Sequence, residues 1–566
     1  MPLCERTADR ISAAVAAAAG REGWPVEPAG VRLERPRDPD HGDFASTLAL
    51  TLARTVGRAP REIAQQLAAT LQEDVALQAD LALEAVEVAG PGFLNFYLAP
   101  AWLEEGLREV LDQGEAYGRS RRLESEAILF EFISANPTGP LNVVSARAAA
   151  VGDALAALWE AAGARVGREY YVNDAGRQVS LLGRSLAARI RQAGGEEASL
   201  PEEGYHGEYL VELAGTFRTK HPEGIEAFAG AAGPGTDPDE ALAAWAVERI
   251  LERQQASVSA FGLHFDTWFR ESSLHEAGAV ERTRTALEAR GHTYRAEEAL
   301  WFRSTAFGDE KDRVLVTGDG RPTYLLPDIA YHEDKYARGW RTLVDLWGPD
   351  HHGYIDRMSA ALQALGHDPG SFRVLIVQQV NLLRGGEPVK MSKRAGRLIE
   401  MNELIEEVGV DAARFFFLLR STSTPLDFDL ELAAARDEEN PVYYVQYAHA
   451  RISSLLEKAR EEGIKIETAV ENADLAALRV PEERALMRLL VDFPDLVAGA
   501  AEAYEPHRLP IWLKDLAAAF HLFYHHHRVV GSNEPEQSAR LALCRAVRQI
   551  LANGLDLLGI SAPERM

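Results

Sequence analysis

The distribution of apolar residues between positions 120 and 175 predicts a strand, a loop, a helix and a second strand. Residues 127–133 form an apolar run with few polar breaks, which is typical of a strand buried on both faces of a parallel sheet. Residues 143–162 are rich in Ala and Leu and end at Gly163, as expected of a helix. Residues 168–172 resume the strand pattern, and residues 134–140 form the loop between the first strand and the helix.

The same alternation of strand and helix returns after residue 300. The pattern predicts a strand over residues 341–347, a loop over 348–353, a helix over 354–365 and a further strand over 372–380. Strands that alternate with helices at this spacing predict a doubly wound parallel sheet. Such sheets bind ligands in the loops at the carboxyl ends of their strands, where both predicted loops lie.

The rest of the sequence completes a multidomain α/β chain. Residues 1–115 mix helical segments with short strands and predict an N-terminal α+β domain. The α/β domain covers residues 116–400 and contains a helical insertion at about 180–265. A connecting segment follows at 401–436, and the helical period of apolar residues over 437–566 predicts a separate, all-helical bundle.

Composition narrows the class of protein without pointing to a function. The 566 residues have a formal net charge of -26, 46% hydrophobic residues and 26% charged residues, which is ordinary for a globular protein. We expect a cytoplasmic protein without membrane spans, since no apolar run reaches the ~20 residues that a span needs. Cys4 and Cys544 predict neither a disulfide nor a metal site. The acidic total argues weakly against coating by nucleic acid, although a local basic stripe would be enough to bind RNA.

Two loops carry residues that are suited to binding phosphate. Lys390 and Lys393 lie three residues apart, and both can face one polyanion. Gly139 and Pro140 precede the helix predicted over 143–162, whose N-terminal amide groups favour phosphate. Each loop also has a plainer interpretation, the first as a solvated basic loop and the second as a simple connection. The loops alone leave this choice open.

Longer phrases resemble the class I aminoacyl-tRNA synthetases, and among them the bacterial arginyl-tRNA synthetases. The segment Lys390-Met-Ser-Lys393 is similar to the KMSKS signature of the class, and the resemblance runs nearly from end to end. The phrases that carry it are EFISANPTGPL (131–141), YVNDAGRQ (171–178), WFRST (301–305), WGPDHHG (347–353) and PVYYVQYAHAR (441–451).

This resemblance implies a Rossmann-like class I synthetase catalytic domain. It also implies an N-terminal domain that contacts the tRNA elbow and a C-terminal bundle that binds the anticodon. The implied reaction attaches L-arginine to tRNA(Arg) through an arginyl-adenylate, with ATP and Mg²⁺. We expect a monomer that needs tRNA already for the first step. The insertion contains nothing recognisably hydrolytic, so no editing activity is expected.

The chain departs from the family at one signature. Asn142-Val-Val-Ser145 replaces His-x-Gly-His, whose histidines donate hydrogen bonds to the ATP phosphates and whose glycine gives the adenine ring room. Asn142 and Ser145 can still donate hydrogen bonds, whereas each donor that was lost would lower the rate by about 100- to 1,000-fold. Val144 adds bulk at the glycine position. We therefore expect a working enzyme whose catalytic residues are Lys390, Lys393, Asn142 and Ser145.

The resemblance also implies the residues that bind the two small substrates. The guanidinium of arginine is a planar cation with five donors, which a carboxylate pair holds best. The implied arginine-binding residues are Glu131, Ser134, Asn136, Glu271, Tyr324 and Asp328. Tyr324 would face the same side as Asp328 if 324–331 is helical. The implied ATP-binding residues are Gly139, Pro140, Asp350, His351, His352, Met391 and Ser392. Without the family, a surface carboxylate at Glu271 and a helix cap at Asp328 would be the better interpretations.

Aromatic and charged side chains alternate in the C-terminal bundle, a pattern suited to stacking on unpaired bases. Such a stripe is more often part of a helical core, so only some of its members are expected to touch RNA. We predict no metal site at residues 525–527, because adjacent histidines on a helix point in different directions. The implied tRNA contacts are Tyr443, Tyr447, His449, Arg451, Trp512 and Arg528, with Phe44 in the N-terminal domain.

Three alternatives compete with an active arginine enzyme. The first is a catalytically weakened paralogue that binds tRNA, which Asn142-Val-Val-Ser145 would explain. The second is a class I synthetase for another amino acid. The acidic pair Glu271 and Asp328 disfavours a negatively charged substrate, and two cysteines cannot build a thiolate zinc pocket of the usual kind. The third is a different nucleotidyltransferase, which would have no use for a tyrosine-rich helical bundle.

Overall fold

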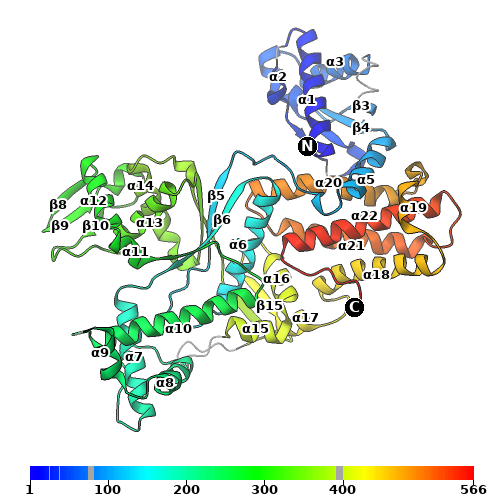
Figure 1. Ribbon diagram of the computed structural model, residues 1–566. Coiled ribbons are helices and arrows are strands. Elements are labelled where there is room, and N and C mark those ends of the chain that lie inside the picture. The colour runs from blue at the N-terminus through cyan, green and yellow to red at the C-terminus, as the bar shows by residue number, and fades with distance from the viewer. Residues whose placement is uncertain (25, 37, 74–81, 234, 390–398) are drawn as a thin grey trace.

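A five-stranded parallel sheet lies in the middle of the molecule (Figure 1). The computed structural model describes residues 1–24, 26–36, 38–73, 82–233, 235–389 and 399–566. The strand order is β12-β11-β5-β6-β7, so the chain moves outwards from β5 in both directions. The point where the direction changes, between β5 and β11, is where such sheets bind ligands. The strands are β5 (Ala127–Glu131), β6 (Arg165–Val172), β7 (Thr267–Arg270), β11 (Thr342–Trp347) and β12 (Phe372–Ile376).

Helices cover both faces of this sheet, as the apolar run in β5 predicts. Ile128 and Phe130 belong to the core that contains α6 (Val143–Ala161), whereas Leu129 belongs to the core that contains α13 (Leu325–Ala337) and α14 (Ile355–Ala364). Alternate side chains of a strand point to opposite faces, so a strand that is covered on both sides must be apolar throughout. The predicted doubly wound sheet is therefore confirmed.

Four helices with a core of their own lie between β6 and β7, where the insertion was expected. After β7 the chain forms two short helices and a three-stranded antiparallel sheet that no pattern predicted. β7 itself was missed, because the α/β pattern was expected to resume only at about residue 300. The insertion helices are α7 (Arg177–Ala193), α8 (Tyr209–Lys220), α9 (Ile225–Ala232) and α10 (Pro238–Ala260). The later elements are α11 (Glu271–Glu276), α12 (Ala279–Ala289), β8 (Thr293–Ala296), β9 (Ala299–Phe302) and β10 (Arg313–Val316).

The prediction of one strand over residues 372–380 is wrong. Val377 N donates to Trp347 O, but Gln378 N donates to Thr422 O, so the chain changes partners and leaves the central sheet. Arg147 of α6 stabilises this change, because its guanidinium donates to the carbonyls of Gln378, Ser421 and Thr424. The segment that leaves the central sheet contributes β13 and β14 to a second sheet, β14-β13-β15. Its strands are β13 (Val380–Arg384), β14 (Glu387–Pro388) and β15 (Leu426–Asp429), with α15 (Met401–Val408), α16 (Val410–Leu418) and α17 (Leu430–Ala434) beside them.

The two ends of the chain form the expected α+β lobe and helical bundle, which touch through α20 (Figure 1). α20 packs against α5 of the N-terminal lobe and against α6 of the central domain. The N-terminal elements are α1 (Leu3–Arg21), β1 (Leu33–Glu34), β2 (Phe44–Ser46), α2 (Leu48–Val56), α3 (Pro60–Gln72), β3 (Leu83–Ala89), β4 (Phe93–Leu98) and α5 (Pro100–Gln113). The bundle consists of α18 (Pro441–Glu461), α19 (Ile466–Glu471), α20 (Pro481–Glu502), α21 (Arg508–His526) and α22 (Glu536–Leu557).

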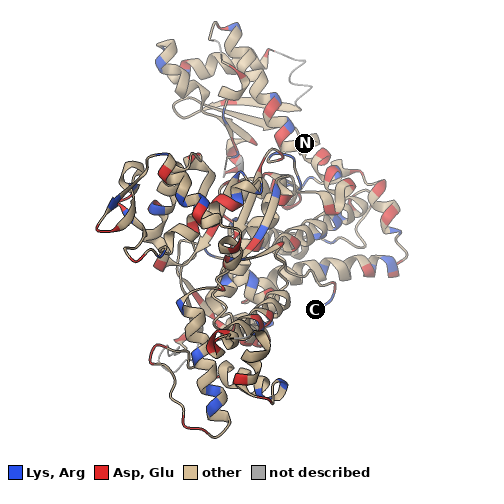
Figure 2. Ribbon diagram, turned by 60° about the vertical axis from the view of Figure 1, so that its left-hand side comes forward, with Lys and Arg blue, Asp and Glu red and all other residues tan. Residues whose placement is uncertain are grey.

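Acidic and basic residues are interspersed over all the lobes in Figure 2. The net negative charge is thus spread over the molecule, as expected of a charge that serves solubility. Within the described ranges, no helix has the length and apolar character that crossing a membrane requires. The domain limits at residues 115, 400 and 436 stay predictions.

Candidate active site

A pocket of about 380 Å³ opens at the carboxyl ends of β5 and β11, where the sheet changes direction. All six residues that the sequence implied for arginine line it, although they come from three separate parts of the chain. Its walls are Glu131, Ile133, Ser134, Asn136, Tyr171, Asn173, Glu271, Tyr324, Pro327, Asp328, Tyr331, His332, Asp345, Leu346, Trp347, Gly348, His351 and Tyr354.

Strained backbone after β5 shapes one wall of this pocket. Ile133 and Ser134 have φ angles of 68° and 39°, in the left-handed region that side chains other than glycine seldom adopt. This turn allows Ser134 Oγ to donate to Glu131 Oε1 at 2.8 Å and to accept from Tyr171 N at 3.1 Å. The strain therefore positions the serine between the ends of β5 and β6.

Glu271 owes its place to the junction of β7 and α11. It is the first residue of α11, directly after β7 ends. Asp174 fixes this junction, since it accepts from Ser272 N at 2.9 Å and from Ser272 Oγ at 2.8 Å. When the side-chain amide of Asn173 is oriented so that both its oxygen and its nitrogen have suitable partners, the nitrogen donates to Glu271 Oε2 at 3.1 Å.

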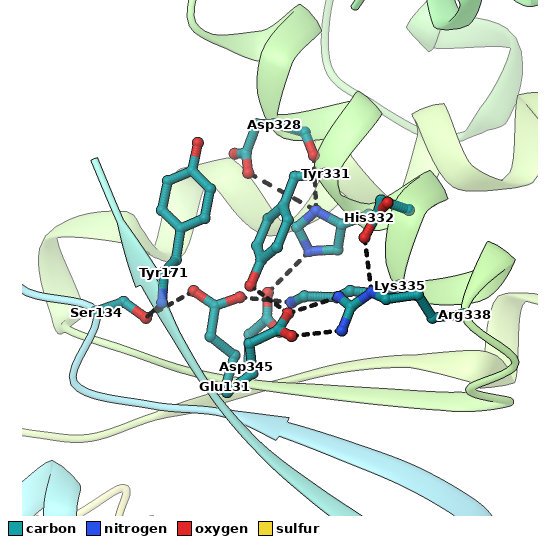
Figure 3. Close-up of polar contacts among 11 residues, drawn as sticks. Glu131, Ser134, Tyr171, Asp328, Tyr331, His332, Lys335, Arg338 and Asp345 are labelled. Carbon is teal, nitrogen blue, oxygen red and sulfur yellow. Dashed lines mark hydrogen bonds and ion pairs between the residues drawn. The ribbon is translucent and has the colours of Figure 1, made fainter. Parts of the chain in front are cut away.

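A network of buried ion pairs forms the floor of the pocket (Figure 3). Lys335 Nζ donates to Glu131 Oε2 at 2.5 Å and to Asp345 Oδ1 at 2.9 Å, and His332 Nε2 lies 2.9 Å from Asp345 Oδ2. Lys335, His332 and Asp345 are each about 1% exposed. Buried charges are tolerated only where partners of opposite sign surround them, as they do here.

A second ion pair, between Arg338 and Glu169, extends this network to β6. Arg338 donates to both oxygens of Glu169, at 2.6 and 2.8 Å, and Tyr331 OH donates to Glu169 Oε1 at 2.7 Å. Glu169 lies within β6, whereas Tyr331 lies on α13 and Arg338 directly follows that helix. The network therefore fixes α13, which carries Asp328, to the sheet.

Asp328 and Glu271 differ from the carboxylates of the floor. Among the described residues, the cations that pair with them are histidines at 3.7 Å, beyond hydrogen-bond distance. Burial raises the pKa of both carboxyl groups above their ordinary values. Because burial without a close cation disfavours the charged form, a cationic ligand between these two groups would be bound tightly.

The raised pKa values predict how arginine binding depends on pH. A carboxyl group with a raised pKa takes up a proton at a higher pH than usual, and only its ionised form attracts a guanidinium. The KM for arginine should therefore rise as pH falls, starting above the ordinary pKa values of 3.8 for Asp328 and 4.5 for Glu271. Steady-state kinetics across the acidic range, with the KM for ATP as control, would measure this. An arginine KM that stays constant down to those ordinary values would contradict it.

The segment that replaces His-x-Gly-His starts α6 with a side-chain cap. Asn142 Oδ1 accepts from Val144 N at 2.9 Å and from Ser145 N at 3.2 Å. Two of the amide groups that were expected to favour phosphate are thus already bonded, and this corrects the prediction. The cap uses only the oxygen of Asn142, so the Nδ2 hydrogens remain as possible donors. The Val144 side chain is 38% exposed and contributes apolar surface beside them.

The other residues implied for ATP lie on two loops at the same edge of the sheet. Insertion side chains hold the first loop, since Gln254 Nε2 donates to Gly139 O at 2.8 Å and Tyr209 OH donates to Thr138 O at 2.5 Å. Pro140 lies beside Tyr209 in a smaller pocket. Asp350, His351 and His352 are exposed on the second loop, and His351 reaches the arginine pocket. Lys390, Met391, Ser392 and Lys393 lie outside the described residues.

Family models match three parts of the chain. They are the arginyl tRNA synthetase N terminal domain at residues 5–98, the catalytic domain of tRNA synthetases class I (R) at 106–207 and the DALR anticodon binding domain at 445–566. The arginine–tRNA ligase of Desulforudis audaxviator is 48% identical over 537 residues, which cover 94% of this chain and 93% of that protein. The chain belongs to the arginyl-tRNA synthetase family.

Other members of the family match as broadly. The arginine–tRNA ligase of Bacillus subtilis is 42% identical over 572 residues, covering all of both chains. The Thermus thermophilus arginyl-tRNA synthetase structure has a TM-score of 0.74 at 26% identity and covers 98% of this chain and 99% of that one. A putative arginyl-tRNA synthetase from Campylobacter jejuni has a TM-score of 0.76 at 37% identity, covering 83% of this chain and all of that one. The expected fold, with its helical anticodon-binding domain, is confirmed.

In an arginyl-tRNA synthetase the DALR domain is the place to seek anticodon contacts, and here it presents an aromatic surface. The rings of Tyr443 and Tyr447 stack 6.1 Å apart, and Tyr447 stacks at 6.0 Å on His521. The guanidinium of Arg451 lies 4.6 Å from the Tyr447 ring centre and 5.4 Å from that of Tyr524. These half-buried rings combine π faces with a cation, as base-stacking surfaces do.

Two of the residues implied for tRNA are buried, which corrects their assignment. Phe44 is 2% exposed and packs edge-on against Trp102 in the N-terminal core. His449 is 5% exposed, and its Nδ1 bonds to Pro563 O at 2.8 Å, so it holds the C-terminal segment against α18. Neither ring can stack on a base without first leaving the core.

The remaining candidates are more accessible. Arg528 is exposed, whereas Trp512 is half-buried and packs on Phe493 at 5.3 Å. His526 and His527 both lie near Glu482, at 3.4 and 3.3 Å, because α21 ends at His526 and the next residue turns. In the described part of the chain, no group of three or more metal-ligating side chains is placed to hold an ion.

Sequence reasoning missed several residues of the pocket. Tyr171 and Asn173 lie inside a phrase that carried the family resemblance, so that phrase was the available signal. No feature of the sequence pointed to the buried charges of Lys335, His332 and Asp345. A lysine that follows a histidine by one helical turn usually marks an exposed face of a helix.

Proposed function

We propose that this chain activates L-arginine with ATP and transfers it to tRNA(Arg), releasing AMP and pyrophosphate. One observation carries the proposal. The pocket at the switch point of the sheet contains two carboxyl groups, Asp328 and Glu271, without a close cation from the described residues. The guanidinium of arginine supplies that cation together with donors for both groups.

The other walls suit the rest of the amino acid. Asn136 lies at the open side, and its Nδ2 donates to Gln178 Oε1 at 2.6 Å. We assign the α-amino or carboxylate end of arginine to Asn136 and Ser134, and the stem to the ring of Tyr324, which is 74% exposed. Tyr324 immediately precedes α13, and Pro327 lies in the first turn of that helix, where proline is tolerated.

ATP would lie next to this end, over the loops at residues 134–140 and 348–353. The arginine carboxylate attacks the α-phosphate in line, and pyrophosphate leaves. We assign Asn142 Nδ2 and Ser145 Oγ as donors to the reacting phosphate, Gly139, Pro140, Asp350, His351 and His352 as the ATP border, and Lys390 and Lys393, with Met391 and Ser392, to the leaving phosphates. The terminal ribose hydroxyl of the tRNA then attacks the adenylate carbonyl, and AMP leaves.

Magnesium would enter this reaction as the counterion of ATP. Mg²⁺ prefers several oxygen ligands and often takes them from phosphates and water. The described residues include no cluster of three or more metal-ligating side chains, so ATP phosphates fit as its main ligands.

The aromatic surface of α18 and α21 gives a prediction for tRNA binding. The Tyr447→Ala variant should raise the KM for tRNA by about 5- to 100-fold, since stacking on one base contributes about 1–3 kcal/mol. The KM values for arginine and ATP should stay within about twofold, because Tyr447 lies on α18 and does not line the arginine pocket. Aminoacylation with tRNA as the varied substrate measures this. Lys514→Ala, an exposed change on α21, is the control; equal effects of the two would exclude a specific contact by Tyr447.

The decisive experiment is aminoacylation of tRNA by the purified chain with each amino acid in turn, alongside ATP–pyrophosphate exchange with and without tRNA. Charging with arginine alone would support the proposal and show that Asn142 and Ser145 suffice for ATP. Exchange only when tRNA is present would support the expected role of tRNA in the first step. Tight tRNA binding without charging would favour the weakened paralogue instead.

A further inference from the structure

His332 lies on the floor of the arginine pocket and makes two polar contacts at once (Figure 3). Its Nδ1 is 2.8 Å from the backbone oxygen of Asp328, and its Nε2 is 2.9 Å from Asp345 Oδ2. Its side chain is 1% exposed. Both ring nitrogens are therefore committed to protein groups.

The two partners determine the protonation state of the ring. A backbone carbonyl can only accept, and an ionised carboxylate can only accept, so each ring nitrogen must carry a proton. Only the imidazolium form has two N–H groups. Asp345 is ionised, because Lys335 and His332 outweigh the effect of burial and lower its pKa to about 2.

The groups around His332 agree with a cation at this position. Asp345 faces it from β11, and Asp328 faces it from one turn earlier on α13. Lys335 opposes its charge, and the apolar sides are closed by the rings of Phe372 at 5.2 Å and Tyr331 at 5.6 Å. Although burial and Lys335 lower the pKa of His332, the two carboxylates raise it above its ordinary value.

The charges of the floor then cancel. His332, Lys335 and Arg338 are paired with the carboxylates of Asp345, Glu131 and Glu169. A neutral floor leaves the Asp328 and Glu271 carboxylates for the substrate. A neutral His332 would add an uncompensated negative charge below the guanidinium and would break one of the two contacts.

We propose, resting on the function proposed above, that His332 is a permanently protonated positioning residue for arginine. By donating to the Asp328 carbonyl and to the Asp345 carboxylate together, it fixes the first turn of α13 against β11 and keeps Asp328 in place at the pocket wall. It touches neither substrate directly, so its effect should fall on arginine binding rather than on ATP binding.

Two substitutions separate the contacts. His332→Asn keeps an amide nitrogen near the position of Nδ1, His332→Gln keeps one near Nε2, and neither keeps the charge. Each should raise the KM for arginine by about 10- to 100-fold, as expected for a lost hydrogen bond to a charged group, with the KM for ATP within about twofold. The control is His367→Gln, which removes a partly exposed histidine that follows α14 and pairs with Glu333 of α13. An unchanged arginine KM in both variants would overturn the proposal.

A double variant tests the charge balance itself. Adding Asp345→Asn to His332→Gln removes the unpaired negative charge, so the double variant should bind arginine better than His332→Gln alone. A purely structural role predicts the opposite, since a second buried substitution would add to the damage. A double variant that is worse than both single variants would therefore contradict the assigned charge.

The protonation state can be observed directly in the wild-type protein by ¹⁵N NMR of the histidine rings. One ring should keep both N–H protons well above pH 6.5, the ordinary pKa of histidine. The other histidines with displaced pKa values, namely His449, His507 and His521, are shifted downwards and should be neutral there. No imidazolium in that pH range would overturn the proposal even if the variants fail to fold. Failure of wild-type protein to charge tRNA would instead refute the proposed function and leave the NMR result standing.

Discussion

Asp328→Asn should raise the KM for arginine by about 100-fold or more, because truncating one partner of a buried charge pair costs about 2–5 kcal/mol. Asparagine is nearly isosteric with aspartate, so the pocket keeps its shape and loses only charge. The Asp328 backbone, which accepts from His332, is unaffected. The KM for ATP should stay within about twofold, since ATP is assigned to the other end of the amino acid.

The measurement is steady-state aminoacylation with arginine as the varied substrate. Glu276→Gln is a matched control, because Glu276 is exposed on the same short helix as Glu271 and lies outside the pocket. Arginine analogues extend the test. Citrulline lacks the positive charge of arginine. Its kcat/KM relative to that of arginine should therefore be higher in the Asp328→Asn variant than in the wild type. If the variant instead raised the KM for ATP and left that for arginine unchanged, the pocket would have to be reassigned to the nucleotide.

The pattern of apolar residues was sufficient to predict the inner strands of the central sheet, but it was not sufficient to predict the strands at the edges. β5 is buried on both faces and is therefore apolar at every position, a signal that survives without knowledge of the partners. β7 has four half-buried residues and no such signal, so the strand that delivers Glu271 was missed. The segment at 372–380 reads as one strand, because a change of hydrogen-bond partner at Val377 and Gln378 leaves no mark on hydropathy.

The site shows the same limit at the level of side chains. Family resemblance found the pocket walls, and Glu131, Ser134 and Asn136 stand in one of the phrases that carry it. It could not show that Lys335 is buried, because burial of a lysine depends on two carboxylates brought by β5 and β11. The implied tRNA contacts at Phe44 and His449 were also wrong, because both aromatic rings are buried in the core.

The Asn142 cap adds a physical reason for the departure from the family signature. A side chain that accepts from Val144 N and Ser145 N stabilises the start of α6 by about 1 kcal/mol. Helix α6 carries Arg147, which clamps the segments at 378–379 and 421–424 beside it. Asn142 thus caps the helix that organises this edge of the sheet through its oxygen, while its Nδ2 hydrogens stay available to a phosphate.

Lys335→Met should destabilise the central domain by about 3–5 kcal/mol, which is the usual result of removing one partner from a buried ion pair. Methionine fills most of the volume of the lysine stem, so the loss is chiefly one of charge. Glu131 and Asp345 would then face each other without their shared cation, and the ring of Tyr331 would lose the ammonium that lies 4.4 Å from its centre.

The loss should depend on pH in a definite direction. Burial already raises the pKa of Glu131 in the wild type, and Lys335 opposes that rise. Without the lysine, Glu131 accepts a proton at a still higher pH and becomes neutral. The destabilisation should therefore be largest above neutral pH and should shrink as pH falls through the raised pKa of the glutamic acid. A loss that is independent of pH would indicate a packing defect instead of an unpaired charge.

Because a chain of several domains seldom unfolds in two states, hydrogen exchange of peptides from α13 and β11 is a better measurement than one melting temperature. Lys458→Met is the matched control, since Lys458 is 67% exposed and lies 3.9 Å from Glu462 in an ordinary surface pair. That control should change stability by less than about 0.5 kcal/mol. Faster exchange confined to α13 and β11 in Lys335→Met, together with a raised arginine KM, would show that the same buried charges support both the fold of this domain and the pocket above it. Exchange that matches the control would instead mean that the lysine contributes nothing to either.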